Sequence, residues 1–155
     1  MKRLTVEPYK EYAKTAFYSI HFENVELCET DRFIEQFSQS EAHQDDLQII
    51  KAWIEKMGNE KGALERYFRP ERNASAIPID VSSLRLYCLR LSDEIVILGN
   101  GGEKTSQAVQ DSPDAYPTFL DMNNLYRVIK ESIRRGNTLK EGKYLTGRLE
   151  FEIND

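Results

Sequence analysis

The chain has 155 residues, of which 40% are hydrophobic and 30% are charged, a balance typical of an ordinary globular domain. Its formal net charge of −5 argues against a general nucleic-acid binder, whose surface carries an excess of basic residues. No apolar run approaches the roughly 20 residues that span a membrane, and the amino terminus lacks a signal-peptide core. We therefore expect one cytoplasmic domain over residues 1–155.

The acidic residues are concentrated in one part of the chain. Residues 23–60 contain ten acidic and three basic residues, whereas residues 61–143 contain eleven acidic and thirteen basic ones. The acidic part is the part that we predict to be helical, so its charges are expected on solvated helix faces. This distribution leaves room for a locally basic surface in the second half of the chain.

Two strands and two helices are predicted in the first half. Residues 15–22 are rich in aromatic and β-branched side chains, as in a strand, and residues 4–6 indicate an edge strand. Thr30 is expected to cap a helix, and a second helix is expected to begin near Ala42 and to end near Gly58. Apolar residues at helical spacing predict their buried stripes: Phe33, Ile34 and Phe37, then Leu47, Ile50, Trp53, Ile54 and Met57.

Arginines alternate with aromatic residues after the second helix. Arg66, Arg69 and Arg72 surround Tyr67 and Phe68 in a stretch predicted to be irregular. Guanidinium groups bind phosphate and aromatic faces stack on bases, so this stretch is a candidate RNA-contacting surface. In the alternative interpretation the aromatic side chains pack under the sheet and the arginines pair with neighbouring acidic residues.

Residues 84–98 predict a β-hairpin, because two apolar runs flank the short polar step Ser92-Asp93. Side chains alternate between the two faces of a strand. One face of the first strand carries Leu84, Leu86 and Cys88, and the other face carries Arg85 and Tyr87. The arginine and the tyrosine, held side by side on a rigid strand, are the clearest chemical signal in the chain. Alternatively, the arginine pairs with an acidic residue across the sheet.

The glycine-rich stretch 99–105 presents Lys104 but does not match a nucleotide-binding loop. Glu103 occupies the position where the G-x-x-x-x-G-K-[ST] pattern requires glycine, and its carboxylate would repel a triphosphate. His21 and His43 have no cysteines at ligand spacing, so no metal and no cofactor are expected. The two cysteines, Cys28 and Cys88, are predicted to be buried free thiols rather than a disulfide.

A third helix and a closing strand are predicted at the carboxy-terminal end. Asp121 is expected to open the helix and Gly136 to close it, and residues 143–153 are expected to form the strand. The outer helix face is basic, which indicates either a solvated surface or a contact with a partner or nucleic acid. Its basic residues are Arg127, Lys130, Arg134 and Arg135.

The remaining candidate chemistry is basic and phenolic. Such residues suit phosphodiester cleavage without a metal, because cations stabilise the extra negative charge of the transition state while a substrate 2′-hydroxyl attacks. The candidate catalytic residues are Arg85, Lys104 and Tyr87, and the candidate RNA-binding residues are Arg66, Arg69, Arg72 and Arg90.

At the hairpin the sequence resembles the RelE/HigB-like family of small bacterial toxins. The matching features are two acid-rich helices before the sheet, the L-R-L-Y strand at 84–87, the strand at 95–98 and the Gly-Gly-x-Lys end at Lys104. The resemblance covers residues 16–110, so residues 111–155 would be a carboxy-terminal extension of the family core. It implies an α+β fold with a curved, mainly antiparallel sheet, two N-terminal helices and an added C-terminal helix and strand.

The resemblance also implies a function. Family members cleave messenger RNA on the ribosome and are neutralised by an antitoxin, here expected to be of the helix-turn-helix type. Arg85 matches the strand arginine that contacts the scissile phosphate, Lys104 falls near the second basic position, and Tyr87 or Tyr116 would supply the late aromatic residue. In the alternative, a non-catalytic relative binds a protein partner through the same sheet, which is favoured if the terminal segment covers the Arg85 face.

Overall fold

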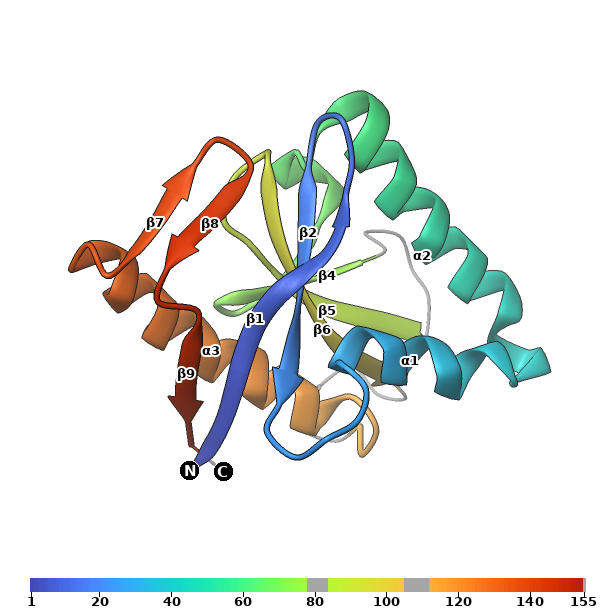
Figure 1. Ribbon diagram of the computed structural model, residues 1–155. Coiled ribbons are helices and arrows are strands. Elements are labelled where there is room, and N and C mark those ends of the chain that lie inside the picture. Colours follow the sequence, from blue (N-terminus) through green and yellow to red (C-terminus); the bar gives the residue numbers. More distant parts are fainter. Residues whose placement is uncertain (78–83, 105–111, 155) are drawn as a thin grey trace.

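The computed structural model describes residues 1–77, 84–104 and 112–154 of this α+β protein. Its main sheet contains β1 (Lys2–Glu11), β2 (Ala16–Phe22), β3 (Arg69–Glu71), β4 (Ala74–Ile77), β5 (Leu84–Arg90), β6 (Ile95–Glu103) and β9 (Glu150–Ile153). Helices α1 (Glu29–Ser38), α2 (Gln44–Lys56) and α3 (Tyr116–Arg134) lie against it (Figure 1). Shorter helical turns occupy Glu41–His43, Met57–Lys61 and Glu65–Tyr67.

The sheet is mostly antiparallel, as predicted. Its strand order is β3-β4-β5-β6-β2-β1-β9. Among the described strands, only β2 and β6 pair in parallel, from Ala16 opposite Ile95 to Ser19 opposite Leu98. A parallel pair requires a long crossover between its strands, and here α1, α2 and the β3–β5 strands supply it.

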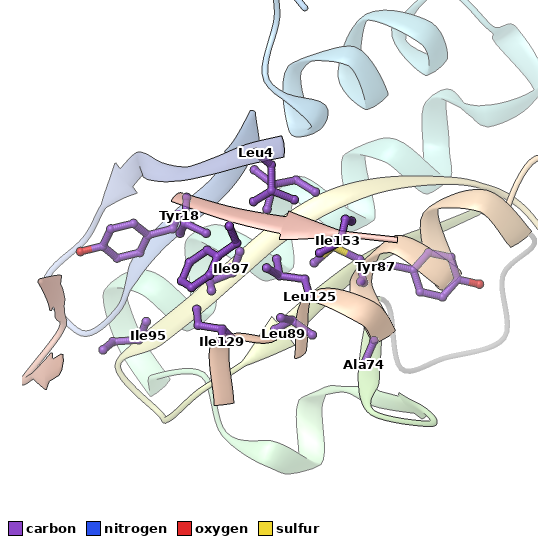
Figure 2. Packing of buried hydrophobic residues seen from close by; sticks show 14 of the residues in the cluster. Leu4, Tyr18, Ala74, Tyr87, Leu89, Ile95, Ile97, Leu125, Ile129 and Ile153 are labelled. Carbon is purple, nitrogen blue, oxygen red and sulfur yellow. The ribbon is translucent and has the colours of Figure 1, made fainter. Parts of the chain in front are cut away.

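Both faces of the central strands β5 and β6 are buried. Helices α1 and α2 cover one face, where Leu84, Leu86 and Cys88 join the core. Helix α3 covers the other face, where Tyr87 and Leu89 pack with the apolar side of the helix (Figure 2). The predicted alternation along β5 is therefore confirmed, but the face expected to carry chemistry is also part of a core.

The structure corrects the predicted starts of two helices and confirms the predicted end of α3. Helix α3 begins at Tyr116 rather than at Asp121, because Pro117 is well tolerated in a first helical turn. Thr30 does not cap α1 as predicted, because Cys28 occupies the position before the helix and Thr30 is buried inside the first turn. Gly136 ends α3 as predicted, with a positive φ of 80° that favours glycine.

The predicted strands at the two chain ends are also corrected. Strand β1 is not an edge strand, because it pairs with β2 on one side and β9 on the other. The expected closing strand at 143–153 is two strands, β8 (Tyr144–Gly147) and β9, and a further strand that was not predicted, β7 (Thr138–Glu141), precedes them. Gly142 and Gly147 reverse the chain between them with positive φ angles of 62° and 86°. Strands β7 and β8 form a separate two-stranded sheet.

The two cysteines, Cys28 and Cys88, are buried free thiols, as predicted. Within the part of the chain that the structure describes, no helix combines the length and apolar character that crossing a bilayer requires.

Close backbone contact at the end of β6 predicts a strong effect of a single methyl group. A Cβ atom at Gly101 would lie 1.8 Å from the carbonyl oxygen of Arg85 and 2.8 Å from the Phe33 ring. We expect Gly101→Ala to lower the free energy of unfolding by about 3 kcal/mol, measured by urea denaturation. Gly136→Ala is the control, because nothing lies within 4 Å of its Cβ position. It should lower the free energy of unfolding by only about 1 kcal/mol, because alanine is strained at a positive φ. Equal losses in the two variants would contradict this interpretation.

Candidate functional site

Cross-strand register brings the predicted cationic residues together on the α3 face. Arg69 on β3 lies opposite Ala76 on β4, and Ala76 lies opposite Tyr87 on β5. Residues directly opposite one another project from the same face of a sheet. The short alanine side chain therefore leaves Arg69 and Tyr87 facing each other above it, and Arg85 shares their face one alternation further along β5.

Arg85 and Tyr87 lie inside the protein. Their exposed fractions are 5% and 0%, and the Tyr87 ring packs edge-on against Phe119 of α3 with ring centroids 6.1 Å apart. Burial lowers the pKa of Arg85, and repulsion from the nearby Arg69 lowers it further. Burial also raises the pKa of Tyr87 well above its ordinary value. The phenol is therefore neutral at physiological pH and can act as a hydrogen-bond donor.

The cluster has more donors than acceptors. Arg69 Nη1, Arg85 Nε and Tyr87 Oη are buried and have no hydrogen-bond partner among the described residues. Glu71 supplies a carboxylate, and its Oε1 lies 3.6 Å from Nζ of Lys104. Because unpaired buried polar groups are rare and costly, this arrangement indicates a place for an external acceptor. We call Arg69, Glu71, Arg85, Tyr87 and Lys104 the cationic cluster.

Three other predicted RNA-binding arginines lie outside this cluster. Arg66 and Arg72 are exposed, and the Arg66 guanidinium lies over the Tyr67 ring at 5.3 Å from its centroid. Arg90, at the far end of β5, donates to the carbonyl of Ala63 at 2.6 Å and pairs with Asp93. Arg90 therefore connects two chain segments, which is a structural role.

The basic face of α3 is partly neutralised by its own carboxylate. Arg134 and Arg135 lie 2.6 and 2.8 Å from Oε1 of Glu131. Their hydrogen bonds, chiefly that from Arg134, lower the pKa of Glu131 to about 2. These pairs favour the interpretation of this face as a solvated surface.

A second candidate site lies at the carboxyl ends of the parallel strands. After β2 the chain enters α1 on one face of the sheet, and after β6 it leads to α3 on the other face. Ligands in sheets with parallel strands bind at such points, where neighbouring strands lead to opposite faces. Here a cavity of about 620 Å³ opens between the two helices, a volume within the usual range of small-molecule sites. We call it the switch-point crevice.

Four chain segments form the wall of the switch-point crevice: the start of β1, the β2–α1 loop with the first turns of α1, the end of β6, and the start of α3. The residues that line it include Lys2, Arg3, Phe22, Val25, Glu29, Arg32, Asn100, Asp114 and Asp121. The sequence did not reveal this site, because its acidic residues resemble ordinary solvated helix charges. The sequence does contain the two strand–helix transitions that border the site. They indicate a ligand site only once β2 and β6 are known to be parallel neighbours.

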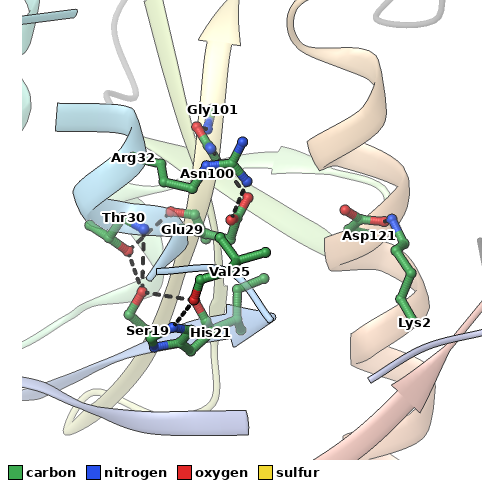
Figure 3. A network of polar contacts seen from close by, with 12 residues as sticks. Lys2, Ser19, His21, Val25, Glu29, Thr30, Arg32, Asn100, Gly101 and Asp121 are labelled. Carbon is green, nitrogen blue, oxygen red and sulfur yellow. Dashed lines mark hydrogen bonds and ion pairs between the residues drawn. The ribbon is translucent and has the colours of Figure 1, made fainter. Parts of the chain in front are cut away.

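Polar contacts fix the α1 side of the crevice (Figure 3). The Glu29 side chain, in a residue only 6% exposed, accepts hydrogen bonds from Arg32 at 2.8 Å and from Asn100 at 3.2 Å. Below it, the Thr30 hydroxyl donates to the carbonyl of Gly99 at 3.1 Å and lies 2.7 Å from the Ser19 hydroxyl. These contacts connect α1 to β2 and β6, so the wall is held rigidly.

His21 holds the β2–α1 loop that borders the crevice. Its Nδ1 lies 2.5 Å from a carboxylate oxygen of Glu7, and its Nε2 lies 2.6 Å from the carbonyl oxygen of Val25. Because both partners are acceptors, the ring binds both best when both nitrogens carry protons. The hydrogen bond to Val25 and then that to Glu7 raise the pKa of His21 above its ordinary value of 6.5.

No group of at least three His, Cys, Asp or Glu side chains suited to a metal ion occurs within residues 1–77, 84–104 and 112–154. Comparison with known proteins found no protein-family model, no curated protein and no solved structure that matches the chain.

The raised pKa of His21 predicts a pH-dependent contribution to stability. The imidazolium stabilises the fold fully below the unfolded-state pKa of 6.5, and this contribution is lost as pH rises through the higher folded-state pKa. Thermal unfolding should therefore show His21→Gln less stable than the unchanged protein at about pH 5.5, with a difference that shrinks by about pH 8.5. A difference that stays constant over this interval would show that His21 is not the titrating group.

Proposed function

We propose that this protein is the toxin-like component of a bacterial toxin–antitoxin pair and acts as a metal-independent endoribonuclease on messenger RNA. The supporting observation is the excess of buried donors in the cationic cluster, where Arg69, Arg85 and Tyr87 each have an unpartnered polar atom. A phosphodiester supplies the acceptors that these atoms lack. The proposal includes a RelE/HigB-like core with a curved sheet, the extension 111–155, a cytoplasmic location and a helix-turn-helix antitoxin.

In the proposed reaction, the 2′-hydroxyl oxygen of the substrate bonds to phosphorus while the bond from phosphorus to the 5′-oxygen breaks. The 2′-hydroxyl loses its proton to solvent and the leaving 5′-oxygen gains one, so the products are a 2′,3′-cyclic phosphate and a 5′-hydroxyl end. Arg85 and Arg69 stabilise the additional negative charge on the phosphoryl oxygens, with Lys104 as a further cation. The neutral phenol of Tyr87 donates a hydrogen bond to the same oxygens.

The position of α3 over the Arg85 face favours a second candidate function, the non-catalytic module that binds a protein partner. Phe119 packs against Tyr87, and Arg85 is only 5% exposed, so α3 lies between this face and solvent. RNA cleavage requires α3 to move away from the cationic cluster. If α3 stays in place, the protein is instead a non-catalytic module that binds a protein partner, and the cluster has a structural role.

Binding of a simple oxyanion tests the cationic cluster directly. Phosphate should raise the unfolding temperature more than chloride does at equal ionic strength. A phosphate concentration tenfold above the dissociation constant should raise the free energy of unfolding by about 1.4 kcal/mol. Glu71→Gln should be less stable in chloride and should gain more from phosphate, because it lacks the carboxylate beside Lys104.

Arg85→Gln should abolish the response to phosphate, and the exposed Arg127→Gln is the matched control that should retain it. Equal phosphate responses in the Arg85 and Arg127 variants would contradict an anion site at the cluster.

Cleavage is tested by induced expression in a bacterium, followed by mapping of transcript ends. We expect growth arrest and new 5′-hydroxyl ends, and we expect Arg85→Ala to reduce cleavage by at least about a hundredfold, as removal of one charge-stabilising group does in other enzymes. Arg127→Ala should cleave normally, and thermal unfolding should verify that both variants fold. Unimpaired growth and intact transcripts would exclude the endoribonuclease and favour the binding module.

A further inference from the structure

The switch-point crevice has a defined charge balance. Three cationic side chains of the wall have carboxylate partners: Lys2 lies 2.6 Å from Asp121, Arg32 lies 2.8 Å from Glu29, and Arg3 lies 2.8 Å from Glu152. Met1, which carries the amino terminus, also lines the crevice. Asp114 also lines the crevice and has no cationic partner within the described residues. The cationic side chains of the wall are thus paired with carboxylates, whereas the exposed Asp114 carboxylate has no such partner.

Lys2 shows how the wall holds an ammonium group. Its Nζ lies 2.6 Å from the Asp121 carboxylate and 5.2 Å from the centre of the Phe22 ring (Figure 3 shows the pair with Asp121). A carboxylate combined with an aromatic face is the usual protein environment for an organic ammonium ion. Lys2 reaches this place from the start of β1, whereas Asp121 belongs to α3 and Phe22 to β2.

Asp121 is the central acceptor of this arrangement. Its side chain is 14% exposed, and burial raises the pKa of its carboxyl group even though Lys2 acts in the opposite direction. A carboxylate with so little water around it gains from any cation that enters the cavity. On the opposite wall, Glu29 and Asn100 provide further acceptor oxygens.

We propose that the switch-point crevice is a binding site for a small organic cation with a primary amine, which contacts Asp121, Asp114 and the Phe22 ring. The ligand ammonium takes the place that Lys2 now holds or lies beside it. A bound anion would be repelled by the Asp114 carboxylate, which has no cationic partner among the described residues. This site is independent of the cationic cluster, so it stands whether or not the protein cleaves RNA.

Putrescine is a suitable probe, with butanediol and succinate as neutral and anionic molecules of similar length. Isothermal titration calorimetry at constant ionic strength should detect putrescine binding and no binding of the other two. Asp121→Asn should weaken putrescine binding at least about tenfold, because it removes a charge-assisted hydrogen bond. Glu141→Gln, on the exposed surface of β7, is the matched control and should leave the affinity unchanged.

Lys2→Met gives the sharpest test, because it removes the internal competitor. Putrescine should bind this variant about three- to fivefold more tightly and should raise its unfolding temperature more than that of the unchanged protein. The Lys2→Met variant tests the proposal even if Asp121→Asn does not fold. Unchanged or weaker binding by Lys2→Met, or binding of succinate with similar affinity, would overturn the proposal.

Discussion

The parallel pairing of β2 with β6 determines how the rest of this molecule is arranged. Two adjacent strands that run in the same direction end at the same edge of the sheet, and each is followed by a helix on a different face. This arrangement buries both faces of the central strands and opens a cavity between α1 and α3 at that edge. The two-layered core and the switch-point crevice therefore have one topological origin.

The cationic cluster illustrates a balance between burial and function. A low-dielectric position strengthens every interaction that Arg85 makes with an anion, but it also makes an uncompensated guanidinium expensive. Glu71 offsets part of this cost through its electrostatic attraction, while Arg69 adds to it. A protein that only needed a stable sheet would fill the space beside Ala76 with apolar side chains. Two guanidinium groups in this position therefore carry an electrostatic cost that apolar packing would avoid.

Local patterns in the sequence predicted local structure well and tertiary relations poorly. The buried stripes of α1 and α2 were predicted correctly except for Ile34 and Trp53, which are only partly buried. Helical spacing gives such stripes without any knowledge of distant residues. Alternation likewise placed Arg85 and Tyr87 on one face of β5. Their burial was not predictable, because it depends on the packing of α3, and the crevice depends on strand pairing between residues far apart in the chain.

The position of β1 has a consequence for the order in which the chain becomes ordered. Lys2 to Thr5 pair with Glu150 to Ile153, at the opposite end of the sequence. During synthesis, one side of β1 stays without its native neighbour until residues 150–153 have left the ribosome. Exposed strand edges of this kind recruit other chains, so nascent molecules are most prone to association during this interval. The neighbouring β1–β2 hairpin forms early, because its partners are close in sequence, and β9 completes the sheet last.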